Sequence, residues 1–102
     1  MPDQDRAQRV SRLRYRSWRR GTREMDLMLG PFADRHLAAM NETDLATYER
    51  LLNESDPDLM NWLSGQVEPP PEMDSDLRAL LRRAAEVIRQ SAAAAAERRK
   101  TS

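Results

Sequence analysis

Cysteine is absent from this sequence of 102 residues, and histidine and lysine occur once each. Without cysteine the chain can form no disulfide, and it has no thiolate for catalysis or metal binding. A zinc site on the one histidine, His36, would need three carboxylates besides it, which is a poor match to the usual ligand sets. We therefore predict that the chain holds no metal or cofactor of its own, and that His36 lies in or beside the core.

Long apolar runs are also missing. The longest is Ala92 to Ala96, far short of the roughly 20 residues that cross a bilayer. The first residues lack the basic and then apolar pattern of a secretory signal. These features predict a soluble cytoplasmic protein that does not insert into a membrane.

Groups of residues that could carry out catalysis are equally scarce. Carboxylates stand two residues apart at Glu24 with Asp26 and at Asp56 with Asp58, but side chains at that spacing on a helix do not face each other. The three glycines are isolated, so no phosphate-binding loop is expected. A chain of this length builds a modest core and has little left to enclose a substrate cleft. The sequence predicts a binding protein and not an enzyme.

The charges, which sum to zero, are separated into blocks along the chain. Residues 6–23 hold eight arginines and no acid, and residues 24–76 hold 13 acids against two arginines. Blocks of like charge are typical of interaction surfaces, although basic and acidic helices packed beside each other would explain them equally well. An arginine-rich helix carrying Tyr15 and Trp18 is also suited to nucleic acid. The acidic middle of the chain argues against this alternative, and we expect no nucleic-acid partner.

Apolar residues recur at helical spacing in five segments, and no strand-like alternation occurs. The predicted fold is all-α, a small five-helix bundle in one domain over residues 9–90. A flexible N-terminus (1–8) and an alanine-rich, basic tail (91–102) flank it. The second helix carries Gly30 and Pro31, and proline removes a backbone donor and crowds the preceding turn. We expect that helix to be kinked there, or to be two short helices that meet.

Capping residues mark the ends of the later helices. We expect Asn41 or Thr43 to cap the third helix, Asp56 to cap the fourth, and Gly65 to end it. The proline-rich stretch 67–72 predicts a stiff, extended connection to the fifth helix.

The basic and acidic blocks meet at Gly21. Glycine adopts positive φ without a clash, so Gly21 is expected directly after the first helix, and Thr22 is expected to cap the second. On this interpretation Arg19 and Arg20 end one helix, where the dipole favours positive charge. Glu24 begins the next.

This junction would present a guanidinium, a bare glycine backbone and a carboxylate in a row, which suits close docking against another protein. The alternative is that the same residues only stabilise the junction. The predicted partner-binding residues are Trp18, Arg19, Arg20, Gly21, Glu24 and Asp26.

Several stretches of the chain form one pattern when they are taken together. They are residues 16–27, Pro31–Phe32, Tyr48–Leu52 and Asp56–Leu63. Within the first, Arg20, Gly21 and Glu24 match the spacing R-G-x-x-E. In order and spacing these motifs resemble the succinate dehydrogenase assembly factor 2 family, over about residues 9–90 and excluding the alanine-rich tail.

The resemblance implies a five-helix chaperone that promotes covalent attachment of FAD to the flavoprotein subunit of succinate dehydrogenase. The fumarate reductase flavoprotein is a second candidate client. The FAD then belongs to the partner, and Arg20 and Glu24 would clamp that partner so that its histidine and the flavin are aligned. Because the chain begins without a mitochondrial presequence, the resemblance points to a bacterial, cytoplasmic member.

Overall fold

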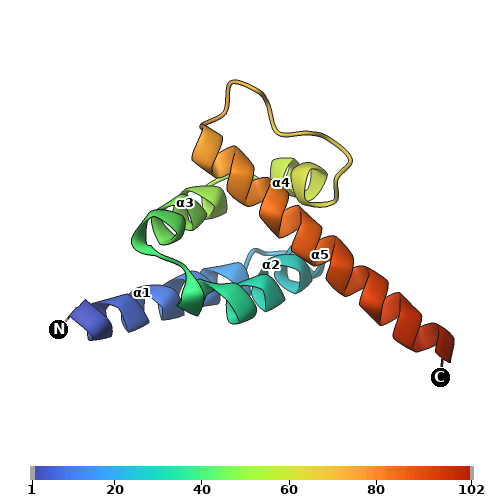
Figure 1. The fold of residues 1–102 in the computed structure, drawn as a ribbon, viewed down its shortest axis with the longest axis horizontal. Helices are drawn as coiled ribbons and strands as arrows, with labels where there is room; N and C mark the ends of the chain where they lie inside the picture. Colours follow the sequence, from blue (N-terminus) through green and yellow to red (C-terminus); the bar gives the residue numbers. More distant parts are fainter. Residues whose placement is uncertain (1, 102) are drawn as a thin grey trace.

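The structure, a computed structural model, describes residues 2–101 and the side chains of residues 4–98. Met1 and Ser102, at the ends of the two predicted tails, lie outside the described residues. Over the described range the chain forms helices and their connections, with no strand (Figure 1). The elements are α1 (Pro2–Ser17), α2 (Arg23–His36), the 3-10 helix η1 (Leu37–Ala39), α3 (Glu42–Leu52), α4 (Asp56–Leu63) and α5 (Ser75–Thr101). The predicted all-α fold with five helices is confirmed.

The helices pack in two groups that share one core. α1 packs on α2, while α5 packs on both α3 and α4. In Figure 1 the C-terminal part of α5 extends beyond the other helices, so the two ends of the chain lie far apart.

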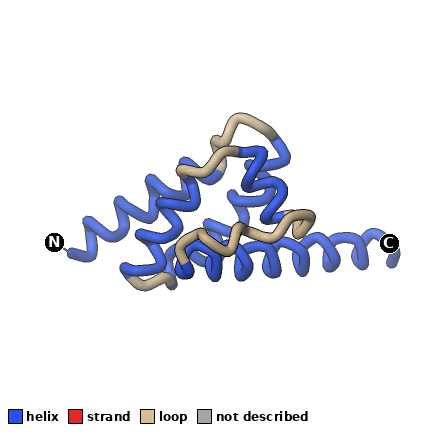
Figure 2. Tube along the Cα trace, turned by 90° about the horizontal axis from the view of Figure 1, so that it is seen from above, coloured by secondary structure: helices blue, strands red, loops and turns tan. Residues whose placement is uncertain are grey.

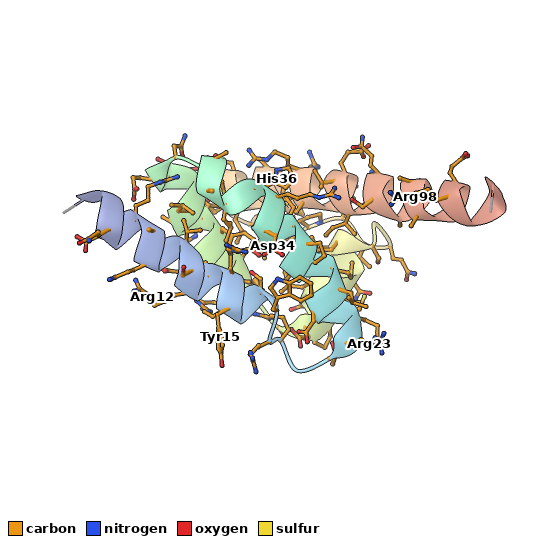
Figure 3. All side chains as sticks on the ribbon, turned by 90° about the horizontal axis from the view of Figure 1, so that it is seen from below. Arg12, Tyr15, Arg23, Asp34, His36 and Arg98 are labelled. Atoms are coloured by element: carbon orange, nitrogen blue, oxygen red, sulfur yellow. The ribbon has the colours of Figure 1, made fainter. Side chains whose placement is uncertain are left out.

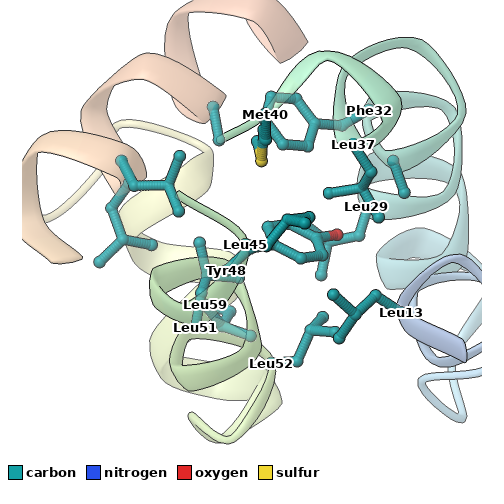
Figure 4. Close-up of a cluster of buried hydrophobic side chains, with 14 of the residues drawn as sticks. Leu13, Leu29, Phe32, Leu37, Met40, Leu45, Tyr48, Leu51, Leu52 and Leu59 are labelled. Carbon is teal, nitrogen blue, oxygen red and sulfur yellow. The ribbon is translucent and has the colours of Figure 1, made fainter. Parts of the chain in front are cut away.

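All five α-helices contribute apolar side chains to a single buried cluster. Tyr48 of α3 has no exposed surface and stacks on Phe32 of α2, with 5.8 Å between ring centroids (Figure 4). Burying one large apolar side chain stabilises the fold by about 1.5–3 kcal/mol. Isolated helices shorter than about 12 residues are marginal in water, so α3 and α4 depend on this shared core.

The core contains one buried pair of hydroxyl groups. Ser17 and Tyr48 are both fully buried, and their hydroxyl oxygens are 2.6 Å apart. The Ser17 hydroxyl also lies 2.8 Å from the Leu13 carbonyl, to which it can donate. Burial raises the pKa of Tyr48 to about 12, against the opposing effects of the Ser17 hydrogen bond and of Arg20.

Most predicted helix ends are confirmed, and one cap is wrong. Thr22 caps α2 and accepts a hydrogen bond from the Met25 N–H at 3.3 Å, and Asn41 caps α3. Gly65 follows α4 with φ of +81°. The N-cap of α4 is Ser55 and not Asp56, because the Asp56 carboxylate is held by an arginine from the α1–α2 loop.

The first helix differs from the prediction at both ends. It begins at Pro2, well before residue 9, and two of its arginines, Arg6 and Arg9, bind Glu42 at 3.1 and 2.8 Å. It ends at Ser17, so Arg19 and Arg20 belong to the following loop. The flexibility of residues 1–8 concerns motion and stays a prediction.

A single helix, α2, passes through Pro31, so the alternative of two short helices is wrong. The kink at Gly30 and Pro31 stays a prediction. His36, at the end of α2, is half-buried and its ring lies 4.8 Å from that of Phe32. This is the boundary position that the sequence predicted.

The connection between α4 and α5 (Figure 2) contacts the first half of α5, where Arg78 donates to the Pro71 carbonyl and Arg82 binds Glu68. At its end Asp74 accepts hydrogen bonds from the backbone N–H groups of Asp76 and Leu77. Arg50 of α3 binds the same carboxylate at 2.7 Å, and these contacts lower the pKa of Asp74. Beyond Gln90, α5 continues as a helix whose side chains are mostly exposed.

Ion pairs between elements explain much of the charge separation in the sequence. Arginines of the basic N-terminal block contact carboxylates of the acidic middle, and α5 contacts the same acidic segment. These pairs are Arg6 and Arg9 with Glu42, Arg14 with Asp34, Arg20 with Asp56, Arg82 with Glu68, and Arg83 with Asp44. The basic and acidic blocks therefore pack against each other.

The raised pKa of Tyr48 makes stability fall at high pH. The unfolded tyrosine ionises near pH 10 while the folded one keeps its proton to about pH 12, so the unfolded state is favoured as pH rises through this window. Between pH 9 and pH 11 the wild type should lose about 1 kcal/mol more unfolding free energy than Tyr48→Phe. Urea denaturation at several pH values measures this. Identical pH profiles would contradict the assignment.

Candidate partner-docking site

The loop of residues 18–22 joins α1 to α2 and carries most of the predicted site. Gly21, at its centre, has φ of +105°, a conformation that side chains disfavour. A Cβ atom built there would meet no atom within 4 Å. Glycine is thus needed for the path of the loop, and the space in front of it is open to solvent.

Arg20 points inward from this loop to the junction of α3 and α4. Its guanidinium binds the Asp56 carboxylate, with Nη2 at 2.7 Å and Nε at 3.0 Å. It also donates to two backbone carbonyls, those of Leu52 and Glu54, the latter at 2.9 Å. The Arg20 side chain is only 12% exposed.

These contacts change the interpretation of Arg20. The carbonyls at the C-terminal end of a helix have no partner within it, and Arg20 supplies donors to the end of α3 while it neutralises the first residue of α4. The sequence predicted a guanidinium presented to a partner, whereas the structure uses this side chain to hold the loop on the bundle. Any contribution of Arg20 to docking is therefore indirect.

Asp26 acts from the other side of the same loop. Its Oδ1 atom accepts a hydrogen bond from the backbone N–H of Arg20 at 2.6 Å, and the side chain is half-buried. Asp26 thus fixes the backbone, and Arg20 fixes the side-chain anchor. Together they set the position of Gly21.

Glu24 differs from both of these residues because it lies on the surface. It is exposed on the first turn of α2, and no hydrogen bond or ion pair with the described residues involves its side chain. Arg19 is also exposed, and its guanidinium lies 4.7 Å from the centre of the Tyr15 ring. Tyr15 is 61% exposed and points away from the bundle (Figure 3).

Trp18 covers the middle of α2. The indole N–H donates to Asp34 at 3.2 Å, and Arg14 binds the same carboxylate at 3.0 Å. A Cβ atom on Gly30 would lie 2.3 Å from the indole ring. A side chain at position 30 would clash with Trp18, so this position of α2 requires glycine. Trp18 itself is 38% exposed.

We give the name docking face to a set of exposed residues from the last turn of α1, the loop and the first turn of α2. It consists of Tyr15, Trp18, Arg19, Gly21 and Glu24. Of the six residues predicted to bind a partner, four lie on it, while Arg20 and Asp26 support it from behind. The sequence did not predict that Asp34, Asp56 and Gly30 would support the docking face. Of these three, only Gly30 could have been noticed, because glycine is unusual inside a helical pattern.

Within the described residues no group of three or more metal-ligating side chains comes together. The arrangement provides an aromatic surface, an exposed cation, a bare backbone and a free carboxylate, which is suited to protein recognition.

Residues 11–85 match the protein-family model described as "Flavinator of succinate dehydrogenase". The chain belongs to this family. The match contains the whole docking face and the residues that support it. The resemblance drawn from the R-G-x-x-E motif is therefore confirmed.

Curated relatives carry the name succinate dehydrogenase assembly factor 2, mitochondrial. The protein of Drosophila virilis is 37% identical over 83 residues, which is 79% of this chain and 52% of the relative. That of Dictyostelium discoideum is 37% identical over 70 residues, or 69% of this chain and 50% of the relative. That of Arabidopsis thaliana is 34% identical over 74 residues, which is 72% of this chain and 39% of the relative. The chain thus spans about half the length of the curated relatives it matches.

These relatives contradict one prediction. They are named mitochondrial and come from an insect, an amoeba and a plant, so the expectation of a bacterial, cytoplasmic protein is wrong. The expectation relied on the start of the chain, which is a weak guide to location. In the described part of the chain, no helix is both long and apolar enough to span a membrane.

The contacts of Arg20 predict that it matters for stability. Arg20→Ala should lower the free energy of unfolding by about 2–4 kcal/mol, because it leaves a carboxylate and two carbonyls without their partner. Urea denaturation at neutral pH measures this. Arg19→Ala is the matched control and should cost less than about 1 kcal/mol, since its contact with Tyr15 is exposed. Equal stability of the two variants would contradict the role of Arg20.

The packing of Trp18 on Gly30 predicts that Gly30→Ala changes the stability in opposite directions in the wild type and in a variant without Trp18. In the wild type, Gly30→Ala should destabilise by about 1–2 kcal/mol, because the new methyl group displaces the indole. In a Trp18→Ala background the same substitution should stabilise by about 1 kcal/mol, because only the helix propensity of alanine remains. Thermal and urea unfolding of the four proteins completes the cycle. The same sign in both backgrounds would show that the indole does not restrict Gly30.

Proposed function

We propose that this chain is an assembly factor of succinate dehydrogenase that binds the flavoprotein subunit and promotes covalent attachment of FAD to it. The family match across the R-G-x-x-E motif supports this most directly. The fumarate reductase flavoprotein is a second candidate client. The chain acts as a chaperone and not as an enzyme, and the FAD is held by the partner.

In this proposal Glu24 is the residue of the motif that contacts the partner. Its carboxylate is exposed and has no partner among the described residues, so it is available to a cation of the flavoprotein. Gly21 lets the partner backbone approach, because the space at its Cβ position is empty. Arg20 and Asp26 keep the loop in one conformation, so little ordering cost arises on binding.

The assembly factor would act by holding the partner in position. Covalent flavin attachment requires a histidine of the flavoprotein to meet the flavin ring in one orientation. Correct alignment alone lowers reaction barriers by several kcal/mol. A rigid docking face would supply this alignment without a catalytic group of its own.

Nucleic-acid binding is less well supported. Five arginines of α1 and its following loop are engaged with carboxylates, carbonyls or an amide oxygen of the same chain, which lowers the charge available to phosphates. Arg12 and Tyr15 do project from α1 (Figure 3). Carboxylates such as Asp34 and Glu42 lie beside this helix and would repel a phosphate backbone.

The test is flavinylation of the purified apo flavoprotein subunit with FAD. Glu24→Ala should slow the appearance of covalent flavin about tenfold or more, because it removes a charge that is desolvated in the complex. Its free energy of unfolding should stay within about 0.5 kcal/mol of the wild type. Flavin fluorescence in a denaturing gel gives the rate.

Glu49→Ala is the matched control, because Glu49 is an exposed acid of α3 without a partner among the described residues. It should leave the rate unchanged. The proposal fails if wild-type protein does not accelerate flavinylation. The assignment of Glu24 fails if Glu24→Ala behaves like Glu49→Ala.

A further inference from the structure

An apolar groove opens between α2 and α5, next to the docking face. Its volume is about 300 Å³, at the lower end of the roughly 300–1,000 Å³ typical of ligand pockets. The residues that line it are Leu27, Met28, Pro31, Phe32, Arg35, Val87, Ile88, Ser91 and Ala92. This groove has no role in the function proposed above.

The apolar surface of the groove is not fully covered by the chain itself. Leu27 is 54% exposed, and Met28, Val87 and Ile88 are only half-buried. Large apolar side chains left open at a groove are typical of a contact with another protein.

The groove carries a single charged residue, Arg35 at its rim. Arg35 is exposed, and no carboxylate pairs with it among the described residues. By contrast, most arginines of α1 have partners within the chain. A free guanidinium beside an apolar surface favours a partner that places a carboxylate next to an apolar side chain.

The groove and the docking face are continuous along one stripe of α2. Glu24, Leu27, Pro31 and Arg35 follow each other at intervals of three or four residues, which puts them on one side of a helix. The stripe is distinct from the buried stripe of Met25, Leu29 and Phe32. It presents an acid, then apolar side chains, then a base. At 1.5 Å per residue the two charges are separated by about 16 Å.

We propose that the groove is a second contact site for the flavoprotein subunit, and this rests on the function proposed above. The segment that binds would carry a cation, an apolar side chain and a carboxylate in that order over about 16 Å. The cation would meet Glu24, the apolar side chain would enter the groove between α2 and α5, and the carboxylate would bind Arg35. Three contacts in line fix the direction of the segment as well as its position.

The experiment measures the dissociation constant of the complex between this chain and the purified flavoprotein subunit by calorimetry. Leu27→Ser and Arg35→Glu should each weaken binding about tenfold or more, the first by removing apolar contact area and the second by charge repulsion. Both side chains are exposed, so both variants should keep the circular dichroism spectrum and melting temperature of the wild type.

Matched controls come from exposed residues that do not line the groove. Val67 is 48% exposed in the connection before α5, and Arg82 of α5 makes an exposed ion pair with Glu68. Val67→Ser and Arg82→Glu should bind within about twofold of the wild type, because exposed ion pairs contribute little.

The outcomes separate this proposal from the function on which it rests. If Glu24→Ala weakens binding while Leu27→Ser and Arg35→Glu bind like the wild type, the groove is not a contact site and the proposed function stands. If the wild type does not bind the subunit, both fall. Analytical ultracentrifugation tests another occupant: a wild-type dimer that Leu27→Ser dissociates, with unchanged flavoprotein affinity, would assign the groove to a second copy of the chain.

Discussion

The contact between the Arg20 guanidinium and the junction of α3 and α4 holds the functional part of this protein in place. One side chain ties the loop after α1 to the end of one helix and the start of the next. Without it the loop would be joined to the bundle through its own ends, Asp26 and the contacts of Trp18 with α2. The docking face is therefore supported by a residue whose own side chain is only 12% exposed.

This arrangement divides the R-G-x-x-E motif into three tasks. The arginine anchors, the glycine allows the backbone path and leaves open space, and the glutamate is presented to solvent. A motif of this kind looks in the sequence like one binding site. In the structure only part of the motif is available to a partner. Removal of the arginine would first lower the stability of the folded protein.

The features that could be predicted from the sequence are those that depend on residues close together along the chain. Helical spacing identified the five helices, and local hydrogen-bonding rules identified Thr22 as a cap and Asn41 as one of two candidates for another. The errors on the end of α1 and on the cap of α4 both involve pairing between distant residues. α1 ends at Ser17, whose hydroxyl lies beside that of Tyr48 in the core, and Asp56 does not cap α4 because Arg20 occupies it. Periodicity carries no information on such pairs, which lie more than 30 positions apart.

Trp18 also gives this protein an internal optical reporter. Its indole is partly exposed on the docking face, with one side against Gly30 and its N–H on Asp34. The chain has only one other tryptophan, Trp62 of α4. With Trp62 replaced by phenylalanine, the emission of Trp18 would report whether a second molecule covers this surface, without any attached dye.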